Sequence, residues 1–237
     1  MSTNIKFPLR FSTLAFHCLI MALALFDLDN TLLTDDSDYL WGCFLVDKGL
    51  VDKESYDEAN QRFYDEYKQG TLDIFEFLNF SLKPLTIYTR HKLDELHREF
   101  MQKYIEPVMT EKGKEQIQYH RARGDFTVII TATNRFVTGP IAKAFAVDDL
   151  IATDPEIIDG EYTGRVAGTP CFQQGKVTRL NQWLEKSSHD LKDSVFYSDS
   201  HNDIPLLEMV TKPIAVDPDE LLKMLALEKH WEIRSFR

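Results

Sequence analysis

Residues 26–33 read FDLDNTLL, and this stretch decides the fold prediction. It closes the apolar run 22–26 (ALALF), the pattern of a short strand that is buried on both faces. Two carboxylates follow at once, Asp27 and Asp29, and residues two apart in an extended segment point to the same side. A lone pair of this kind more often caps a turn than does chemistry, so the rest of the chain must decide.

The chemistry open to this pair is phosphoryl transfer. A carboxylate such as Asp27 can attack phosphorus and form an aspartyl-phosphate, provided that the incoming negative charge is neutralised. Asp29 is placed to protonate the leaving alkoxide and later to activate water. We therefore take Asp27 and Asp29 as the candidate catalytic residues.

Other short apolar runs alternate with helical patterns. The runs 126–131 (FTVIIT), 194–198 (SVFYS) and 213–216 (PIAV) predict further strands. Apolar residues at helical spacing follow the second strand and precede the third: Val137, Ile141, Phe145, Val177, Leu180 and Leu184. This alternation predicts an α/β fold with a doubly wound, mainly parallel sheet and a Rossmann-like core.

The segment 36–106 has a different pattern. Several amphipathic helices succeed one another between about 37 and 105, without a convincing strand between them. We expect an inserted all-helical cap over 36–106, with the α/β catalytic core formed by 21–35 and 107–237. Two short β runs around Asp159 and Gly160 predict a separate hairpin over 156–166.

A second acidic group follows the strand at 194–198. Residues 197–208 read YSDSHNDIPLLE and place Asp199, Asn202 and Asp203 in the loop after it. A few hard oxygen ligands that leave room for water and phosphate suit octahedral Mg²⁺. Asp203 can instead cap the following helix, or do both.

Two weaker signals lie between the acidic groups. Residues 128–136 (VIITATNRF) offer the Thr131 hydroxyl and then backbone amides, beginning with Ala132, to phosphate oxygens near a helix start. Residues 175–180 (GKVTRL) offer Lys176, whose ammonium can neutralise a transferring phosphoryl group. Strand-end threonines and surface lysines are common, so neither signal is specific by itself.

Together the four segments resemble, in order and type, the motifs of the haloacid dehalogenase-like phosphatase superfamily, over nearly all of 22–216. The resemblance implies Asp27 as nucleophile and metal ligand, and Asp29 as acid/base whose backbone carbonyl binds Mg²⁺. It implies that Thr131 and Lys176 bind phosphate and that Asn202 lies near it. It also implies Asp199 as a metal ligand and Asp203 as a direct or outer-shell one.

The position of the cap narrows the resemblance to the phosphoserine-phosphatase-like branch. Stretches such as DNTLL, SDYLWG, ITATNRFVTGPIA, DGEYTGR and PCFQQGKVTRLNQWL are similar to a bacterial group that includes histidinol-phosphate phosphatases. The substrate expected from this is L-histidinol phosphate. Its amine needs an acidic partner, for which Asp36 and Asp38 are candidates, and Trp41 is a candidate for packing on the imidazole. A helix-terminal charge and a core indole are the competing readings.

Three other functions stay open at this stage. Phosphoserine or another small monoester is the alternative substrate. A phosphomutase would use the same aspartyl-phosphate but return the phosphoryl group to a sugar phosphate. A phosphate- or Mg²⁺-binding protein without turnover would have no use for an acid/base at Asp29.

The net charge and the cysteine spacing limit the classes of binding partner and the compartment that we expect. With 27 basic and 38 acidic side chains the net charge is −11, which opposes binding to nucleic acid. The cysteines Cys18, Cys43 and Cys171 show no metal or redox spacing, so we expect a protein of the reducing cytoplasm. A small phosphorylated metabolite is the partner that the resemblance implies. The sequence makes no prediction about its oligomeric state.

The first residues resemble a signal peptide but fit that role poorly. Lys6 and Arg10 precede a mainly apolar run from 11 to 26, and cleavage after Ala24 would remove most of the strand that presents Asp27. The run is also short and interrupted, which disfavours a membrane span. We interpret 1–20 as a disordered extension or as sequence upstream of a true start at Met21.

Overall fold

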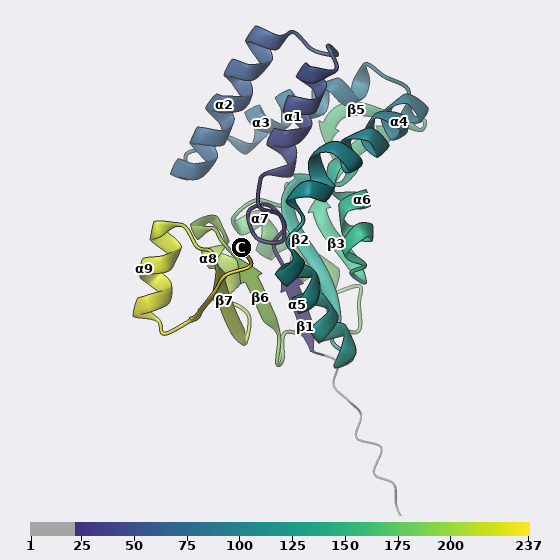
Figure 1. Ribbon diagram of the computed structural model, residues 1–237. Coiled ribbons are helices and arrows are strands. Elements are labelled where there is room, and N and C mark those ends of the chain that lie inside the picture. Colours follow the sequence, from purple (N-terminus) through teal and green to yellow (C-terminus); the bar gives the residue numbers. More distant parts are fainter. Residues whose placement is uncertain (1–21) are drawn as a thin grey trace, which may run out of the picture.

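The structure is a computed structural model and describes residues 22–237 (Figure 1). The predicted N-terminal extension and the predicted start at Met21 lie outside the described residues. Within 22–237 the chain forms a sheet flanked by helices, with a further group of helices beyond one end of the sheet.

A six-stranded, fully parallel sheet forms the centre of the fold. Its strand order is β3-β2-β1-β6-β7-β8, and β1 (Leu23–Phe26) pairs with β2 (Phe126–Asn134) on one side and β6 (Val195–Ser198) on the other. The outer strands are β3 (Asp149–Thr153), β7 (Lys212–Val216) and β8 (Glu232–Arg234). The predicted α/β fold with a doubly wound parallel sheet is confirmed.

The strand β2 is longer than predicted. The predicted run ends at Thr131, but the strand continues to Asn134, so Ala132 lies inside the strand and not after it. The pairing with β3 shifts register between Ile130 and Asn134. A register shift of this kind bends the strand and interrupts its hydrogen bonds to the neighbouring strand. Such irregularities are common beside active sites.

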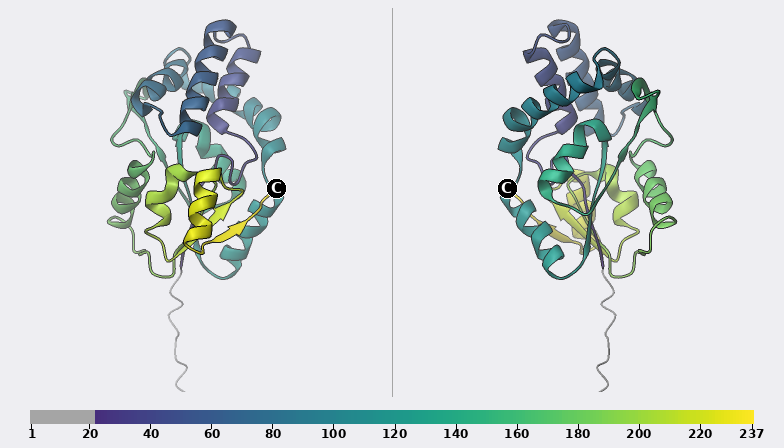
Figure 2. Two further views of the ribbon diagram at one scale, coloured as in Figure 1. Left: turned by 90° about the vertical axis from the view of Figure 1, so that its left-hand side faces the viewer. Right: turned by 90° about the vertical axis from the view of Figure 1, so that its right-hand side faces the viewer.

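Helices cover both faces of the sheet (Figure 2). On one face lie α5 (Glu111–Ala122) and α6 (Arg135–Phe145); on the other lie α7 (Gln174–Leu184), α8 (Ile204–Leu207) and α9 (Glu220–Glu228). Successive residues of β1 alternate between the two apolar cores, Leu23 and Leu25 in one and Ala24 and Phe26 in the other. This two-sided burial explains why the run 22–26 is wholly apolar.

Four α-helices follow β1 and lie beyond the carboxyl end of the sheet (Figure 1). They are α1 (Ser37–Asp47), α2 (Lys53–Gln69), α3 (Ile74–Leu82) and α4 (Arg90–Phe100); short turns η1 (Lys83–Thr86), η2 (Met101–Ile105) and η3 (Glu106–Val108) complete the segment. Each helix begins after a side chain that accepts a hydrogen bond from its first turn, namely Asp36, Asp52, Asp73 and Thr89. We call these helices the helical segment. The bounds of the cap at 36 and 106 stay a prediction.

An aromatic cluster joins the helical segment to the sheet layer. The Trp41 ring lies 5.1 Å from that of Phe100 and 5.3 Å from that of Phe136, and it stacks on His97. Trp41 is almost fully buried in this cluster. The hypothesis that Trp41 packs on a substrate imidazole is therefore wrong: its indole packs inside the protein.

The predicted hairpin is present as β4 (Pro155–Ile158) and β5 (Glu161–Val166). Asp159 and Gly160 both have positive φ, of 52° and 86°, which suits the tight turn of a two-residue hairpin. The hairpin lies beside the helical segment, where the Arg90 guanidinium sits 4.2 Å above the Tyr162 ring. Over residues 22–237 we find no helix that is long and apolar enough to cross a membrane.

Candidate active site

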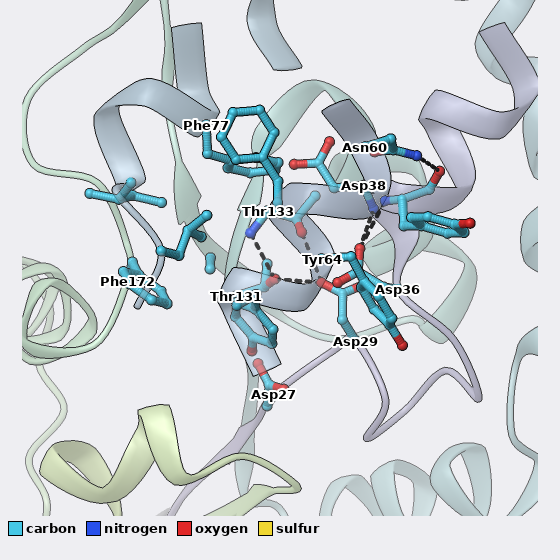
Figure 3. A pocket seen from close by; sticks show the side chains of 16 residues that line it. Asp27, Asp29, Asp36, Asp38, Asn60, Tyr64, Phe77, Thr131, Thr133 and Phe172 are labelled. Atoms are coloured by element: carbon cyan, nitrogen blue, oxygen red, sulfur yellow. Dashed lines mark hydrogen bonds between the residues drawn. The ribbon is translucent and has the colours of Figure 1, made fainter. Parts of the chain in front are cut away.

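The predicted site residues meet at the edge of the sheet where the connections after neighbouring strands run to opposite faces. Asp27 follows β1, Asp199 follows β6, and Thr131 lies in the last part of β2. The helix after β2 covers one face of the sheet and the helix after β6 covers the other, so a crevice opens at the carboxyl end of β1. Figure 3 shows Asp27, Asp29 and Thr131 lining one cavity there.

Asp27 is buried and paired with Lys176. Its amide donates to the Tyr197 carbonyl (2.8 Å), which extends the β1–β6 pairing by one residue. One carboxylate oxygen accepts a hydrogen bond from Lys176 Nζ at 2.7 Å, and Asp27 is only 3% exposed. Burial raises the pKa of Asp27 to about 7, although the Lys176 charge opposes this rise; the Asp203 and Asp29 charges add to it.

Lys176 bridges two carboxylates. Its ammonium, 3% exposed, donates to Asp27 and to Asp203, both at 2.7 Å. Burial lowers the pKa of Lys176, but the two carboxylates more than offset this and the pKa lies above its usual value. Lys176 is therefore a fixed positive charge beside the candidate nucleophile.

The candidate metal ligands hold more negative charge than Lys176 can neutralise. The Thr31 hydroxyl lies 3.0 Å from one Asp199 oxygen and 3.4 Å from an Asp27 oxygen, so these carboxylates converge. Burial, then the charges of Asp27 and Asp203, raise the pKa of Asp199 well above its usual range. Two buried carboxylates, Asp27 and Asp203, and the partly buried Asp199 face one ammonium, which fits a site that takes a further cation.

The side-chain donors alone do not complete a metal site. In the part of the chain that the structure describes, no three His, Cys, Asp or Glu side chains converge on a common point. A Mg²⁺ ion keeps several waters and takes few protein carboxylates, so it does not require three such side chains.

The loop after β6 directs its side chains to different partners. Asp203 accepts hydrogen bonds from Lys176 and from the Ser198 hydroxyl at 2.7 Å each. Asn202 instead contacts the helical segment: its amide donates to the Tyr67 carbonyl (3.3 Å) and its oxygen accepts from Gln173 (2.8 Å). The loop thus joins the candidate phosphate site to the end of α2.

Asp29 is held by three donors. One oxygen accepts from the Ser37 amide (2.7 Å), and the other accepts from the hydroxyls of Thr133 (2.9 Å) and Thr131 (3.2 Å). The predicted phosphate ligand Thr131 therefore contacts the candidate acid/base in this state. Thr31 and Thr133 are site residues that the sequence analysis missed. Thr133 lies two residues from Thr131 in an extended strand, a spacing that could have revealed it.

The cavity extends from Asp27 into the helical segment. Its lining combines acidic and aromatic side chains, together with threonines and Ala132: Asp27, Asp29, Asp36, Asp38, Tyr39, Asn60, Phe63, Tyr64, Tyr67, Leu72, Ile74, Phe77, Thr131, Ala132, Thr133 and Phe172. In Figure 3, Asp27 lies at the lower end of the cavity, and Asp38 and Phe77 lie toward the helices. No lysine or arginine is among these lining residues.

The sequence profile of the haloacid dehalogenase-like hydrolases matches residues 24–208, which contain all the side chains described at the candidate site. The chain belongs to this family. The match begins in β1 and ends just after α8, so it spans the strands that meet at the crevice.

Two of the curated relatives of this family member are phosphatases. It is 45% identical over 219 residues to the histidinol-phosphatase of Neisseria meningitidis serogroup C, covering 91% of this chain and 99% of that one. It is 29% identical to a phosphoserine phosphatase of Mycobacterium tuberculosis, covering 92% and 72%. The chain is accordingly a phosphatase, a hydrolase of small phosphate monoesters.

Solved structures support the same fold. A Bordetella pertussis protein of unknown function has 45% identity and a TM-score of 0.86, covering 91% of this chain and 99% of that one. A substrate-bound phosphoserine phosphatase has 20% identity and a TM-score of 0.65, covering 91% and 93%, and shows the likeness of the fold alone.

Proposed function

We propose that the protein is a Mg²⁺-dependent phosphatase of L-histidinol phosphate that works through an aspartyl-phosphate on Asp27. The observation that carries this proposal is the buried pair of Asp27 and Lys176 next to Asp29, at one end of an acidic and aromatic cavity. The similarity to the Neisseria histidinol-phosphatase supports the choice of substrate.

Asp27 and Asp29 carry the two chemical steps of the proposed mechanism. An Asp27 oxygen attacks phosphorus and the ester P–O bond breaks, while Asp29 gives its proton to the departing alcohol oxygen. Asp29 then takes a proton from water, which attacks the aspartyl-phosphate; inorganic phosphate leaves and Asp27 is free again. The three hydrogen bonds to Asp29 keep its carboxyl group directed to the cavity.

Several groups would bind the phosphate and neutralise its charge. Lys176 supplies an ammonium that is already beside Asp27, so no reorganisation is needed when negative charge develops. The Thr131 hydroxyl, the Ala132 amide and Asn202 are the proposed phosphate donors.

The proposed Mg²⁺ site uses the carboxylates of Asp27 and Asp199 and the carbonyl of Asp29. Asp203 accepts hydrogen bonds from Lys176 and Ser198, and this favours an outer-shell place for it. When bound, Mg²⁺ would neutralise charge on the transferring phosphoryl group. Asp27 would then be ionised and ready to attack, since a nearby cation favours the charged form of a carboxyl group.

The charge of the cavity favours histidinol phosphate over phosphoserine. Phosphoserine brings a carboxylate next to its amine, and among the lining residues that the structure describes there is no lysine or arginine to receive it. Histidinol phosphate has an amine and an imidazole but no carboxylate, which suits an acidic and aromatic wall. We propose that the reaction takes place in the cytoplasm, where the small metabolite would be made.

A phosphate-release assay tests the function. Wild-type protein with Mg²⁺ is assayed on histidinol phosphate, phosphoserine and common sugar phosphates, and we expect histidinol phosphate to give the highest kcat/KM. Asp27→Asn should lower kcat by at least about a thousandfold while the thermal transition stays cooperative. Full activity of Asp27→Asn would contradict the mechanism, and a preference for phosphoserine would contradict the substrate. Transfer of phosphate to a sugar phosphate without its release would indicate a mutase.

A further inference from the structure

Asp38 differs from the other acidic residues of the cavity because one of its carboxylate oxygens is buried and has no hydrogen-bond partner among the described residues. It lies in the first turn of α1 and is 8% exposed, and it lines the cavity that begins at Asp27. Its Oδ2 atom is fully buried and accepts no hydrogen bond from the described residues, 22–237. A carboxylate that has lost water without gaining a donor carries an unusually large desolvation cost.

Asp36, two residues earlier, already accepts hydrogen bonds within the protein. One of its oxygens accepts hydrogen bonds from the amides of Asp38 and Tyr39, both at 2.9 Å, and so caps α1. Asp36 therefore has a structural role at the start of the helix. Asp38 has no comparable role in the fold, and this distinguishes the two candidates that the sequence left open.

The surroundings of Asp38 offer no internal cation. Among residues 22–237 no lysine or arginine lines the cavity, and the ammonium of Lys176 is committed to Asp27 and Asp203. Burial, followed by the Asp29 charge, raises the pKa of Asp38 to about 7. Within the described part of the chain, therefore, no side chain supplies a positive charge to Asp38, and a cationic group of the substrate can fill this place.

We propose that Asp38 is the specificity-determining residue of this site and accepts a hydrogen bond from a protonated nitrogen of the leaving group. The substrate class is then a phosphate monoester of an amino alcohol, with its ester phosphate at Asp27 and its ammonium at Asp38. This inference rests on the proposed phosphatase mechanism, but it names the group that selects the substrate.

The test compares two esters that differ in one group. Histidinol phosphate is paired with its analogue in which hydrogen replaces the amino group, and the ratio of their kcat/KM values is measured for the wild type and for Asp38→Asn. We expect the ratio to fall by about 10- to 100-fold in Asp38→Asn, the worth of one hydrogen bond between charged groups. The loss should appear mainly in KM for the ammonium ester.

Asp36→Asn is the matched control, because asparagine caps a helix about as well as aspartate. We expect this variant to change the ratio much less. A ratio that Asp38→Asn leaves unaltered would overturn the inference, as would an equal loss on both esters, since that is the result of a structural role. Asparagine removes a buried charge without changing side-chain size, and a melting curve of each variant verifies folding.

The role of Asp38 can be tested even if histidinol phosphate is not the substrate. If the wild type prefers another monoester, the same comparison is made with phosphoethanolamine and ethyl phosphate. A wild type without preference for the ammonium ester in either pair would contradict the role of Asp38, even if phosphate is released. Absence of phosphate release from every ester would contradict the phosphatase mechanism instead.

Discussion

At the residue scale, Lys176 partly neutralises the negative charge of the aspartates in the candidate site. Its ammonium is the shared partner of Asp27 and Asp203, and all three groups are at least 97% buried. Removing one partner of a buried ion pair leaves the other charges without compensation. The same lysine therefore stabilises the fold and prepares the nucleophile.

Replacing Lys176 by methionine should lower both stability and activity. We expect a loss of about 3–5 kcal/mol in the free energy of unfolding near neutral pH, measured by denaturant titration without metal. Phosphate release should fall by at least about a hundredfold. Lys186→Met, at an exposed position just after the same helix, is the control and should change neither quantity appreciably. Equal stability of the two variants would show that the buried pair is not formed.

Asp38 should make the stability of the metal-free protein depend on pH. Its pKa is raised from 3.8 to about 7, so the folded state keeps a proton that the unfolded state loses between these values. The unfolding free energy should therefore fall as pH rises through this window, and Asp38→Asn should remove at most about 4 kcal/mol of that fall. Asp29, Asp36 and, from α2, Tyr56 are the other titratable groups near Asp38. Parallel pH profiles for wild type and variant would contradict the raised pKa.

The sequence located the charged residues of the site but not the threonines that bind them. Asp27, Asp29, Lys176 and Asp199 could be found because each ends or begins a recognisable element. Thr31 and Thr133 were missed because threonine in a strand or turn needs no functional explanation, although the two-residue spacing of Thr131 and Thr133 was a signal for the second. Trp41 shows the converse error: an indole near a predicted site packs in an aromatic core whose members are distant in sequence.

At the element scale, the end of α2 lies on the loop that follows β6. Gly70 ends α2 with φ of 70°, and a Cβ atom added there would lie 2.9 Å from His201 Nε2. Next to this contact, Asn202 donates to the Tyr67 carbonyl. The position of the helical segment over the cavity therefore depends on a close approach between these two elements.

Gly70→Ala should disturb that approach, and Gly49→Ala provides a matched control. Gly49 has a similar φ of 65°, but a Cβ atom there would meet nothing within 4 Å. Both variants should lose about 1 kcal/mol of stability from the left-handed backbone. Only Gly70→Ala should also lower kcat/KM, by about tenfold or more, because either α2 or the His201 ring, which Asp219 holds at 2.7 Å, must shift. Equal kcat/KM values for the two variants would show that this contact does not position the helices.

The strands divide into those that the sequence revealed and those that it did not. The central strands β1, β2, β6 and β7 are apolar runs, because both of their faces are covered. The strand β3 is buried after Asp149, but its apolar run is only residues 150–152; β8 (EIR) has an exposed isoleucine between two partly exposed charged residues, so neither has the long apolar run that predicts a buried strand. The last three residues of β2 were missed because Thr133 and Asn134 are polar, which reflects their place beside the site.

At the scale of the whole molecule, the doubly wound sheet brings together residues that are far apart in sequence. Lys176 meets an aspartate 149 residues earlier and another 27 residues later. Strand β1 lies between β2 and β6, and the connections after these two strands leave on opposite faces. The site is therefore a property of the topology, and binding of a cation there should stabilise the entire fold.

Mg²⁺ should raise the thermal midpoint of the wild-type protein. At a concentration about 100 times the dissociation constant, the gain is about 2.7 kcal/mol, and a chelator should reverse it. Asp199→Asn should abolish most of this gain by removing a proposed ligand. Asp159→Asn, at the turn of the hairpin, should respond to Mg²⁺ as the wild type does. A full Mg²⁺ effect in Asp199→Asn would contradict the proposed ligand set.

The most direct test of the central proposal is chemical trapping of the aspartyl-phosphate. Wild-type protein is quenched during turnover of histidinol phosphate and treated with borohydride, which reduces an acyl phosphate to an alcohol, and its peptides are analysed by mass spectrometry. We predict homoserine at position 27, in the peptide that contains FDLDNTLL, and no such product without Mg²⁺. Modification at any other aspartate, or undiminished turnover with Asp27 never modified, would contradict the account.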